Sequence, residues 1–209
     1  SASGKSAALL LDMYEKKQFA PASFDLPAAE RIRNSNKEDA RATAIWDAVK
    51  NRYEAERKAF KSKLTKYMAI AEKKGGEAKA GKVLFQTCLL CHKVGNEGKN
   101  IAPALDGSAS RENEALLTAI LDPDAAVESN YAVYRITKKN GSTIEGYLVN
   151  KNNRGTTIAF MGGSQVFVEA GAIQSQGFLG GRSFMVKGLI DQYSDKQVAD
   201  LLAYIRTIK

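Results

Sequence analysis

The two cysteines and the only histidine of this chain lie together in one short segment, Cys88-Leu89-Leu90-Cys91-His92. Cysteines so close in sequence are poorly placed to staple distant parts of a fold together. A hydrophobic core must therefore hold the chain, and 209 residues with 44% apolar content can form one good-sized core or two small ones. We expect a folded protein whose cysteines serve chemistry.

The spacing of this segment is that of covalent haem attachment. In a C-x-x-C-H pattern, two thiols add to the two vinyl groups of a haem, and the adjacent imidazole binds the iron. Cys88 and Cys91 are therefore predicted to carry one haem c, with His92 as an iron ligand.

Two other uses of the cysteines fit the sequence less well. A structural zinc site normally needs four protein ligands, and the chain has no Cys or His outside this segment. A thioredoxin-like redox pair would follow a strand and open a helix, whereas a helical pattern over residues 81–87 precedes Cys88. Haem attachment is the favoured interpretation.

The net charge of +8 comes mostly from the first 75 residues, where basic and acidic residues alternate as they do on solvated helix faces. Such an excess favours acidic partners. No arginine-rich run or nucleic-acid motif is present, so we expect no nucleic-acid partner. No segment approaches the ~20 apolar residues of a membrane span, and the start lacks the apolar region of a secretory signal, so an exported form would be a mature piece.

Apolar residues recur at helical spacing through residues 5–74, which predicts a small helical unit. The segment KKGGEAKAGK, residues 73–82, is small, charged and rich in glycine. We place a domain boundary there, giving a helical domain over 1–75 and a second domain over 76–209.

The second domain changes its periodicity twice. A short helix leads into Cys88, and another is predicted at about 111–121, before Asp122-Pro123. Residues 131–176 then alternate in the manner of strands around Asn140-Gly141, a dipeptide suited to the positive φ angles of a tight hairpin. The terminal segment returns to helical spacing, with a capping box at Ser194 and Gln197. The fold class is mainly α with a small antiparallel β insertion.

A second iron ligand is less clear from the residues. Met161 and Met185 are the thioethers downstream of His92, and lysine, tyrosine or no protein ligand are the other options. Met161 lies in a glycine-flanked turn of the β insertion, which would have to fold over the haem to place it. Met185 precedes the terminal helix, where a loop covering the haem would lie.

Several residues in this order resemble class I cytochromes c, and more closely the C-terminal haem-binding domain of large dehydrogenase-like proteins of planctomycetes and verrucomicrobia. They are Gly81, Phe85, Cys88, Cys91, His92, Ala102-Pro103-Ala104-Leu105, Leu121-Asp122-Pro123, Tyr131, Ser183-Phe184-Met185 and Asp200-Leu201-Leu202. The resemblance covers about 77–209. It implies a cytochrome c fold with the β unit between the haem-attachment segment and the methionine loop, and Phe85 packing on Tyr204.

The resemblance also implies the roles of site residues. Met185 would be the second iron ligand, and the Pro103 carbonyl would accept a hydrogen bond from the His92 ring and so orient it. Two positions depart from the family pattern: Ala102 replaces a glycine, and Val186 replaces a proline that helps to fix the methionine loop.

These features predict a mono-haem c-type cytochrome that transfers single electrons and is not itself an enzyme. Residues 1–75 weakly resemble helical repeats that precede the haem domain in the larger proteins, so we expect a C-terminal electron-transfer module of a larger redox protein. A dehydrogenase would be the donor, and a cytochrome or an oxidase the acceptor. Haem c is attached outside the bacterial cytoplasm, which implies a periplasmic or other extracytoplasmic location.

Two alternatives stay open at this point. If Met185 is absent from the iron or leaves it easily, the chain would be a haem-based gas sensor or a peroxidase-like enzyme, although no second histidine or distal acid–base pair is evident. The other is a mainly structural or docking module, in which the helical unit and the β insertion bind a partner, and this is compatible with electron transfer.

Overall fold

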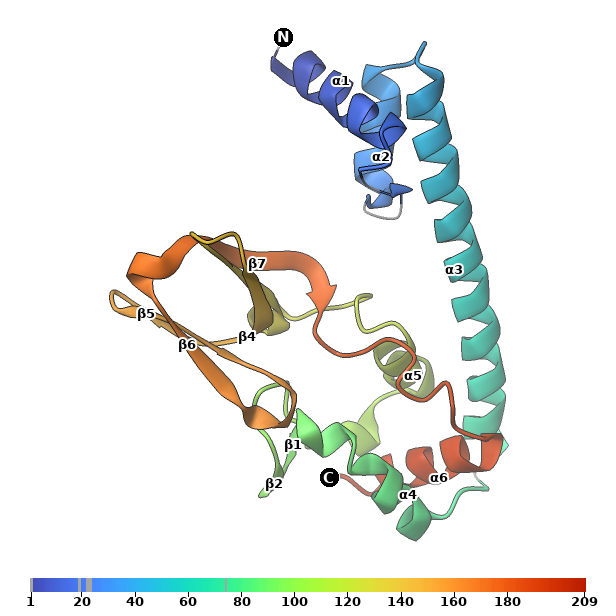
Figure 1. Ribbon diagram of the computed structural model, residues 1–209. Coiled ribbons are helices and arrows are strands. Elements are labelled where there is room, and N and C mark those ends of the chain that lie inside the picture. The colour runs from blue at the N-terminus through green and yellow to red at the C-terminus, as the bar shows by residue number, and fades with distance from the viewer. Residues whose placement is uncertain (1, 19, 22–23, 74) are drawn as a thin grey trace. The chain divides into compact units, whose positions relative to one another are not determined.

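The computed structural model describes residues 2–209 apart from 19, 22–23 and 74 (Figure 1). The chain divides into two compact units, Ser1–Ser62 and Lys63–Lys209. Helix α3 (Ala40–Lys73) contributes to both. This division falls earlier than the domain boundary placed near residue 75, because Leu64, Tyr67 and Met68 of α3 pack into the core of the second unit.

Three helices build the first unit: α1 (Ala2–Glu15), α2 (Leu26–Ser35) and the first part of α3. Asp25 caps α2 by accepting a hydrogen bond from the Ala28 backbone N–H at 2.7 Å. Aliphatic side chains from all three helices form the buried core: Leu11, Ala29, Ile32, Ala42, Ile45 and Val49. The helices predicted from the periodicity are confirmed.

Helices α4 (Ala78–Phe85), α5 (Asn113–Leu121) and α6 (Asp195–Ile205) surround the main core of the second unit, together with the end of α3. Phe85 packs edge-to-face on Tyr204 with ring centroids 5.1 Å apart, as expected. The predicted capping box between Ser194 and Gln197 is present. Among the described residues, no helix has the length and apolar character to cross a membrane.

Helices α4 and α6 cross with their backbones in close contact. A Cβ built on Gly81 would lie 1.9 Å from the Asp200 carbonyl oxygen, so only glycine fits at this position. The Asp200 carboxylate in turn accepts a hydrogen bond from the Glu77 backbone N–H at 2.6 Å. This crossing fixes the end of α4, and hence the start of the cysteine segment.

Five antiparallel strands form the β unit, in the order β6-β5-β4-β3-β7 (Figure 1). Their bounds are β3 Ala132–Lys138, β4 Thr143–Asn152, β5 Gly155–Ala159, β6 Gln165–Glu169 and β7 Ile173–Ser183. A separate pair, β1 (Lys93–Val94) and β2 (Glu97–Gly98), follows His92. The unit has its own buried cluster, centred on Tyr134, Ile136, Ile158 and Val168.

The hairpin predicted at Asn140-Gly141 joins β3 to β4, but its geometry differs from the prediction. Gly141 has a φ of +83°, whereas Asn140 is not in the left-handed region. The Asn140 side-chain oxygen instead accepts a hydrogen bond from the Ser142 backbone N–H at 3.0 Å. The side chain of Asn140 therefore stabilises the turn that its backbone was expected to form.

Strand β7 extends the sheet beyond the limit of about 176 that the sequence suggested. Glycines interrupt its alternating pattern, and its pairing with β3 contains two register shifts. The added length matters for the site, because the strand ends at Ser183, immediately before Phe184 and Met185.

Candidate functional site

The cysteine segment forms a tight turn directly after α4. Residues Cys88–Leu90 make one turn of 3-10 helix, and the Cys88 carbonyl accepts hydrogen bonds from Cys91 N–H at 3.2 Å and His92 N–H at 2.9 Å. Wrapping the backbone around one carbonyl gathers both thiols and the imidazole at a single turn. The two cysteines are half-buried and not joined by a disulfide.

The two thiols face different hydrophobic clusters. Cys88 packs against the helical core that contains Phe85 and Leu89. Cys91 packs against a second cluster, formed by Ala102, Tyr147 and Ala159. The turn that holds the cysteines therefore lies where the helices and the β unit meet within the second unit.

The ring of His92 is held by the hydrogen bond expected from the resemblance. Its Nδ1 lies 2.6 Å from the Pro103 carbonyl oxygen. A carbonyl can only accept, so Nδ1 carries a proton, and in the neutral ring the Nε2 lone pair is left to bind a metal. Burial lowers the pKa of His92, with the Pro103 hydrogen bond opposing it, and so favours the neutral, ligating form.

Backbone hydrogen bonds fix the position of the Pro103 carbonyl. The N–H groups of Ile101 and Ala102 both donate to the Cys91 carbonyl, at 3.2 and 3.0 Å, and Leu105 N–H donates to the Lys93 carbonyl at 2.9 Å. Ala102, which stands where the family pattern has glycine, is 1% exposed and packs on Tyr147. Its methyl group therefore fits the site.

The protonation of the thiols bears on the alternatives. Burial raises the pKa of Cys88 to about 11. Burial also raises the pKa of Cys91, opposed by a hydrogen bond that its sulfur accepts from the Gly162 backbone N–H. Disulfide exchange requires a thiolate as the attacking group. Burial of these cysteines stabilises the thiol over the thiolate, which disfavours disulfide exchange.

The β unit reaches the cysteine segment, which sequence reasoning missed. Besides the Gly162 hydrogen bond to Cys91, the buried Tyr147 of β4 packs on the same cluster as Cys91. Burial, with a smaller contribution from Cys91, raises the pKa of Tyr147 to about 12. Strand alternation marks Tyr147 as facing one side of the sheet, but it does not reveal which segment covers that side.

The structure brings the neighbours of both candidate methionines to this region. The 3-10 turn Met161–Gly163 places Gly162 at Cys91, while the Met161 side chain is 47% exposed. Phe184 packs on Tyr147, and Met185 beside it is half-buried. These contacts involve the neighbours of the two methionines and do not decide which sulfur would bind a metal.

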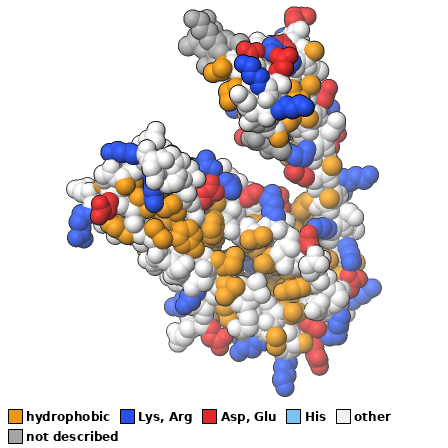
Figure 2. Space-filling model, viewed as in Figure 1, with side chains coloured by type: hydrophobic (Ala, Val, Ile, Leu, Met, Phe, Trp, Pro, Cys, Tyr) orange, Lys and Arg blue, Asp and Glu red, His pale blue; other side chains and the backbone are white. Residues whose placement is uncertain are grey.

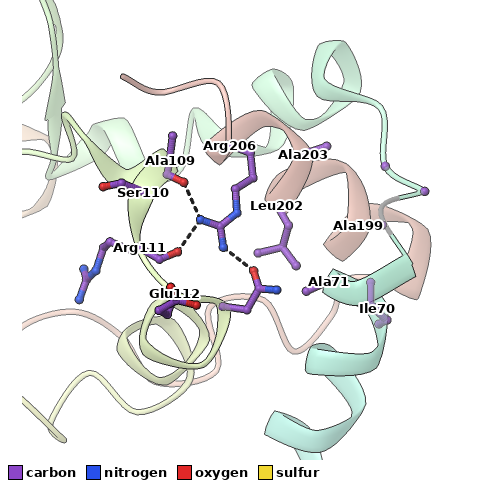
Figure 3. Close-up of a pocket in the computed structure, with 13 residues that line it drawn as sticks. Ile70, Ala71, Ala109, Ser110, Arg111, Glu112, Ala199, Leu202, Ala203 and Arg206 are labelled. Carbon is purple, nitrogen blue, oxygen red and sulfur yellow. Dashed lines mark hydrogen bonds between the residues drawn. The ribbon is translucent and has the colours of Figure 1, made fainter.

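A separate cavity of about 600 Å³ lies between the end of α3, α6 and the segment 109–113 (Figure 3). The Arg206 guanidinium points into it and donates to the Ala109 carbonyl at 2.8 Å, the Arg111 carbonyl at 2.5 Å and the Asn113 side chain. None of the five predicted site residues lines this cavity. Arg206 thus ties α6 to the chain before α5.

The family of the chain follows from comparison with known proteins. The cytochrome c family model matches residues 78–209. The chain belongs to the cytochrome c family. A search of the curated proteins found no match.

Membership of the cytochrome c family makes this chain a haem-binding electron-transfer protein. The residues present fit a covalently attached haem. Two thiols stand on one turn with an imidazole whose Nδ1 contacts the Pro103 carbonyl, so that Nε2 of the neutral ring would be available to the iron. Apolar clusters on both sides of the turn suit the apolar faces of a porphyrin.

Proposed function

We propose that this cytochrome c carries a single haem, bound covalently through Cys88 and Cys91, with His92 and Met185 as the two iron ligands. The observation that carries the proposal is the 2.6 Å contact between His92 Nδ1 and the Pro103 carbonyl, one turn from both thiols. It holds the imidazole in the tautomer and orientation that iron ligation requires.

Met185 is the preferred sixth ligand on two grounds. Its neighbour Phe184 packs on Tyr147, with ring centroids 5.2 Å apart, in the cluster that also contains Cys91. Met185 is half-buried, whereas Met161 is largely exposed. With a histidine and a thioether on the iron, no position remains open for a substrate, and the bound haem supplies one-electron redox chemistry.

The protein residues around this site would orient the His92 ring and keep water away from the haem. Pro103 aims the imidazole, the Cys91–Tyr147 cluster shields one side, and Phe85 with Leu89 shields the other. Because these groups belong to packed cores, we expect them to move little when the haem changes oxidation state. Electron transfer is fast when the groups around the redox centre rearrange little.

In the β unit, the exposed Met161 lies next to Gly162, the residue that contacts Cys91, and this turn is the place where we infer that a redox partner docks. Exposed apolar side chains lie on the β unit, and Figure 2 shows hydrophobic side chains gathered over the strands. They include Val149, Met161, Val166, Phe167 and Phe178. On the face that Figure 2 shows, Lys and Arg are spread among acidic residues and form no single basic patch. The net charge of +8 would assist the approach of acidic partners.

We further propose an extracytoplasmic module of a larger redox protein, taking electrons from a dehydrogenase and passing them to a cytochrome or an oxidase. Covalent haem attachment outside the bacterial cytoplasm and the resemblance of residues 77–209 support this. Haem content and peptide mapping after export to the periplasm would test it, since haem bound to Cys88 and Cys91 without export would contradict the location.

The iron ligands are tested by absorption spectra of the oxidised holoprotein. We expect the weak long-wavelength band of a methionine–ferric bond in wild type and in Met161→Ala, and its loss in Met185→Ala. Survival of the band in Met185→Ala would assign the sixth ligand elsewhere. Absence of the band from wild type would favour the gas-binding or peroxidase-like alternative.

A further inference from the structure

The loop that carries Met185 is anchored on both sides to one pair of carboxylates. Before the methionine, the Ser183 backbone N–H donates a hydrogen bond to Asp124 Oδ1 at 2.7 Å. After it, Lys187 Nζ lies 3.0 Å from Asp124 Oδ2 and 2.9 Å from Asp122 Oδ1. Both anchors act within two residues of Met185.

The carboxylates stand on a rigid base. Asp122 ends helix α5, where its N–H donates to the Thr118 carbonyl at 2.9 Å, and the same helix buries Leu116 and Leu117 in the core. Pro123 between the two aspartates is buried and restricts the backbone. A group bound to this pair is therefore held relative to the helical core.

The loop has few other supports on its far side. Val186, where the family pattern has a proline, is 52% exposed and so contributes little packing. Met185 N–H bonds to the Ser183 hydroxyl at 3.1 Å, a contact within the loop itself. Among the described residues, Lys187 is thus the first after Met185 whose side chain pairs with another element.

We propose that Lys187 is a positioning residue for Met185: by pairing with Asp122 and Asp124 it closes the loop on α5 and holds the thioether on the iron. The inference rests on the proposed function, because it takes Met185 as the ligand.

The test is competition at the iron by free imidazole, which binds the ferric holoprotein only when the methionine leaves. An exposed ion pair of about 1 kcal/mol corresponds to about a fivefold change in such an equilibrium. We expect Lys187→Gln to bind imidazole about fivefold more tightly than wild type, and Lys187→Arg to restore the wild-type affinity. Haem attachment and the Soret band of the imidazole-free protein should stay unchanged.

A matched control is Lys66→Gln. Lys66 pairs with Asp195 at 2.6 Å with similar side-chain exposure, but touches neither the methionine loop nor the two aspartates. We expect Lys66→Gln to bind imidazole as wild type does. Salt gives a second readout: it should raise the imidazole affinity of wild type by weakening the ion pairs, and have less effect on Lys187→Gln.

The outcomes separate the two proposals. If Met185→Ala lacks the methionine band while Lys187→Gln and Lys66→Gln bind imidazole equally, Met185 is the ligand and the role given to Lys187 is wrong. If the band survives in Met185→Ala, the ligand assignment fails and the inference fails with it. A Lys187→Arg variant that behaves like Lys187→Gln would also overturn the inference, because arginine keeps the charge.

Discussion

The ring of Tyr147 on β4 lies against the ring of Phe184, with centroids 5.2 Å apart and an interplanar angle of 69°. This contact joins the β unit to the segment that leads into Met185. Tyr147 also packs in the cluster that contains Cys91 and Ala102. The β unit is therefore part of the site and not an appendage to it.

Replacing Tyr147 tests whether this packing stabilises the folded protein. Tyr147 is 5% exposed, so Tyr147→Ala should lower the free energy of unfolding by about 3 kcal/mol through the cavity it leaves. Tyr147→Phe keeps the ring against Phe184 and should cost about 1 kcal/mol or less. Denaturant unfolding of the holoprotein, followed by circular dichroism, measures both. Equal losses in the two variants would show that the hydroxyl, and not the ring, carries the effect.

The crossing of α4 and α6 should not tolerate a methyl group at Gly81. A Cβ there would lie 1.9 Å from backbone oxygen, which cannot move without shifting α6. Gly81→Ala should therefore lower the free energy of unfolding by about 3 kcal/mol or more. Thermal unfolding is the measurement, and Gly177→Ala is the control. A Cβ at Gly177 meets nothing within 4 Å, so this change should stay within about 0.5 kcal/mol of wild type.

Asp200 should give a pH-dependent contribution to stability. Hydrogen bonds from the Lys196 side chain and then from the Glu77 backbone N–H hold the pKa of Asp200 below its ordinary value of 3.8. The unfolded chain therefore binds a proton at higher pH than the folded one, and stability is lost as the pH falls through the folded-state pKa. The contribution is fully present above the ordinary pKa.

The comparison that isolates this contribution is between wild type and Asp200→Asn. We expect the wild type to be more stable at pH 7 and the difference in unfolding free energy to narrow steadily below about pH 4. Urea unfolding at a series of pH values measures it. A difference that stays constant down to the lowest pH would mean that the charge of Asp200 plays no part.

Much of the candidate site could be predicted from the sequence because its determinants are local. The cysteine turn is defined by three residues within one segment, and the cap of α6 by Ser194 and Gln197. The hairpin after β3 follows from Asn140-Gly141, although the angle of Asn140 does not. The family match over 78–209 agrees with the part of the chain that carries the resemblance.

The sequence by itself thus determined the chemistry, because the two thiols and the imidazole that attach a haem are separated by only a few residues of the chain. Only the tertiary structure decided what surrounds them. The Gly162 bond to Cys91, the packing of Tyr147 on Phe184 and the reach of Lys187 to Asp122 and Asp124 join residues far apart in the chain. Such contacts depend on how strands and helices pack, and periodicity records only which face of an element is apolar, not what will cover it.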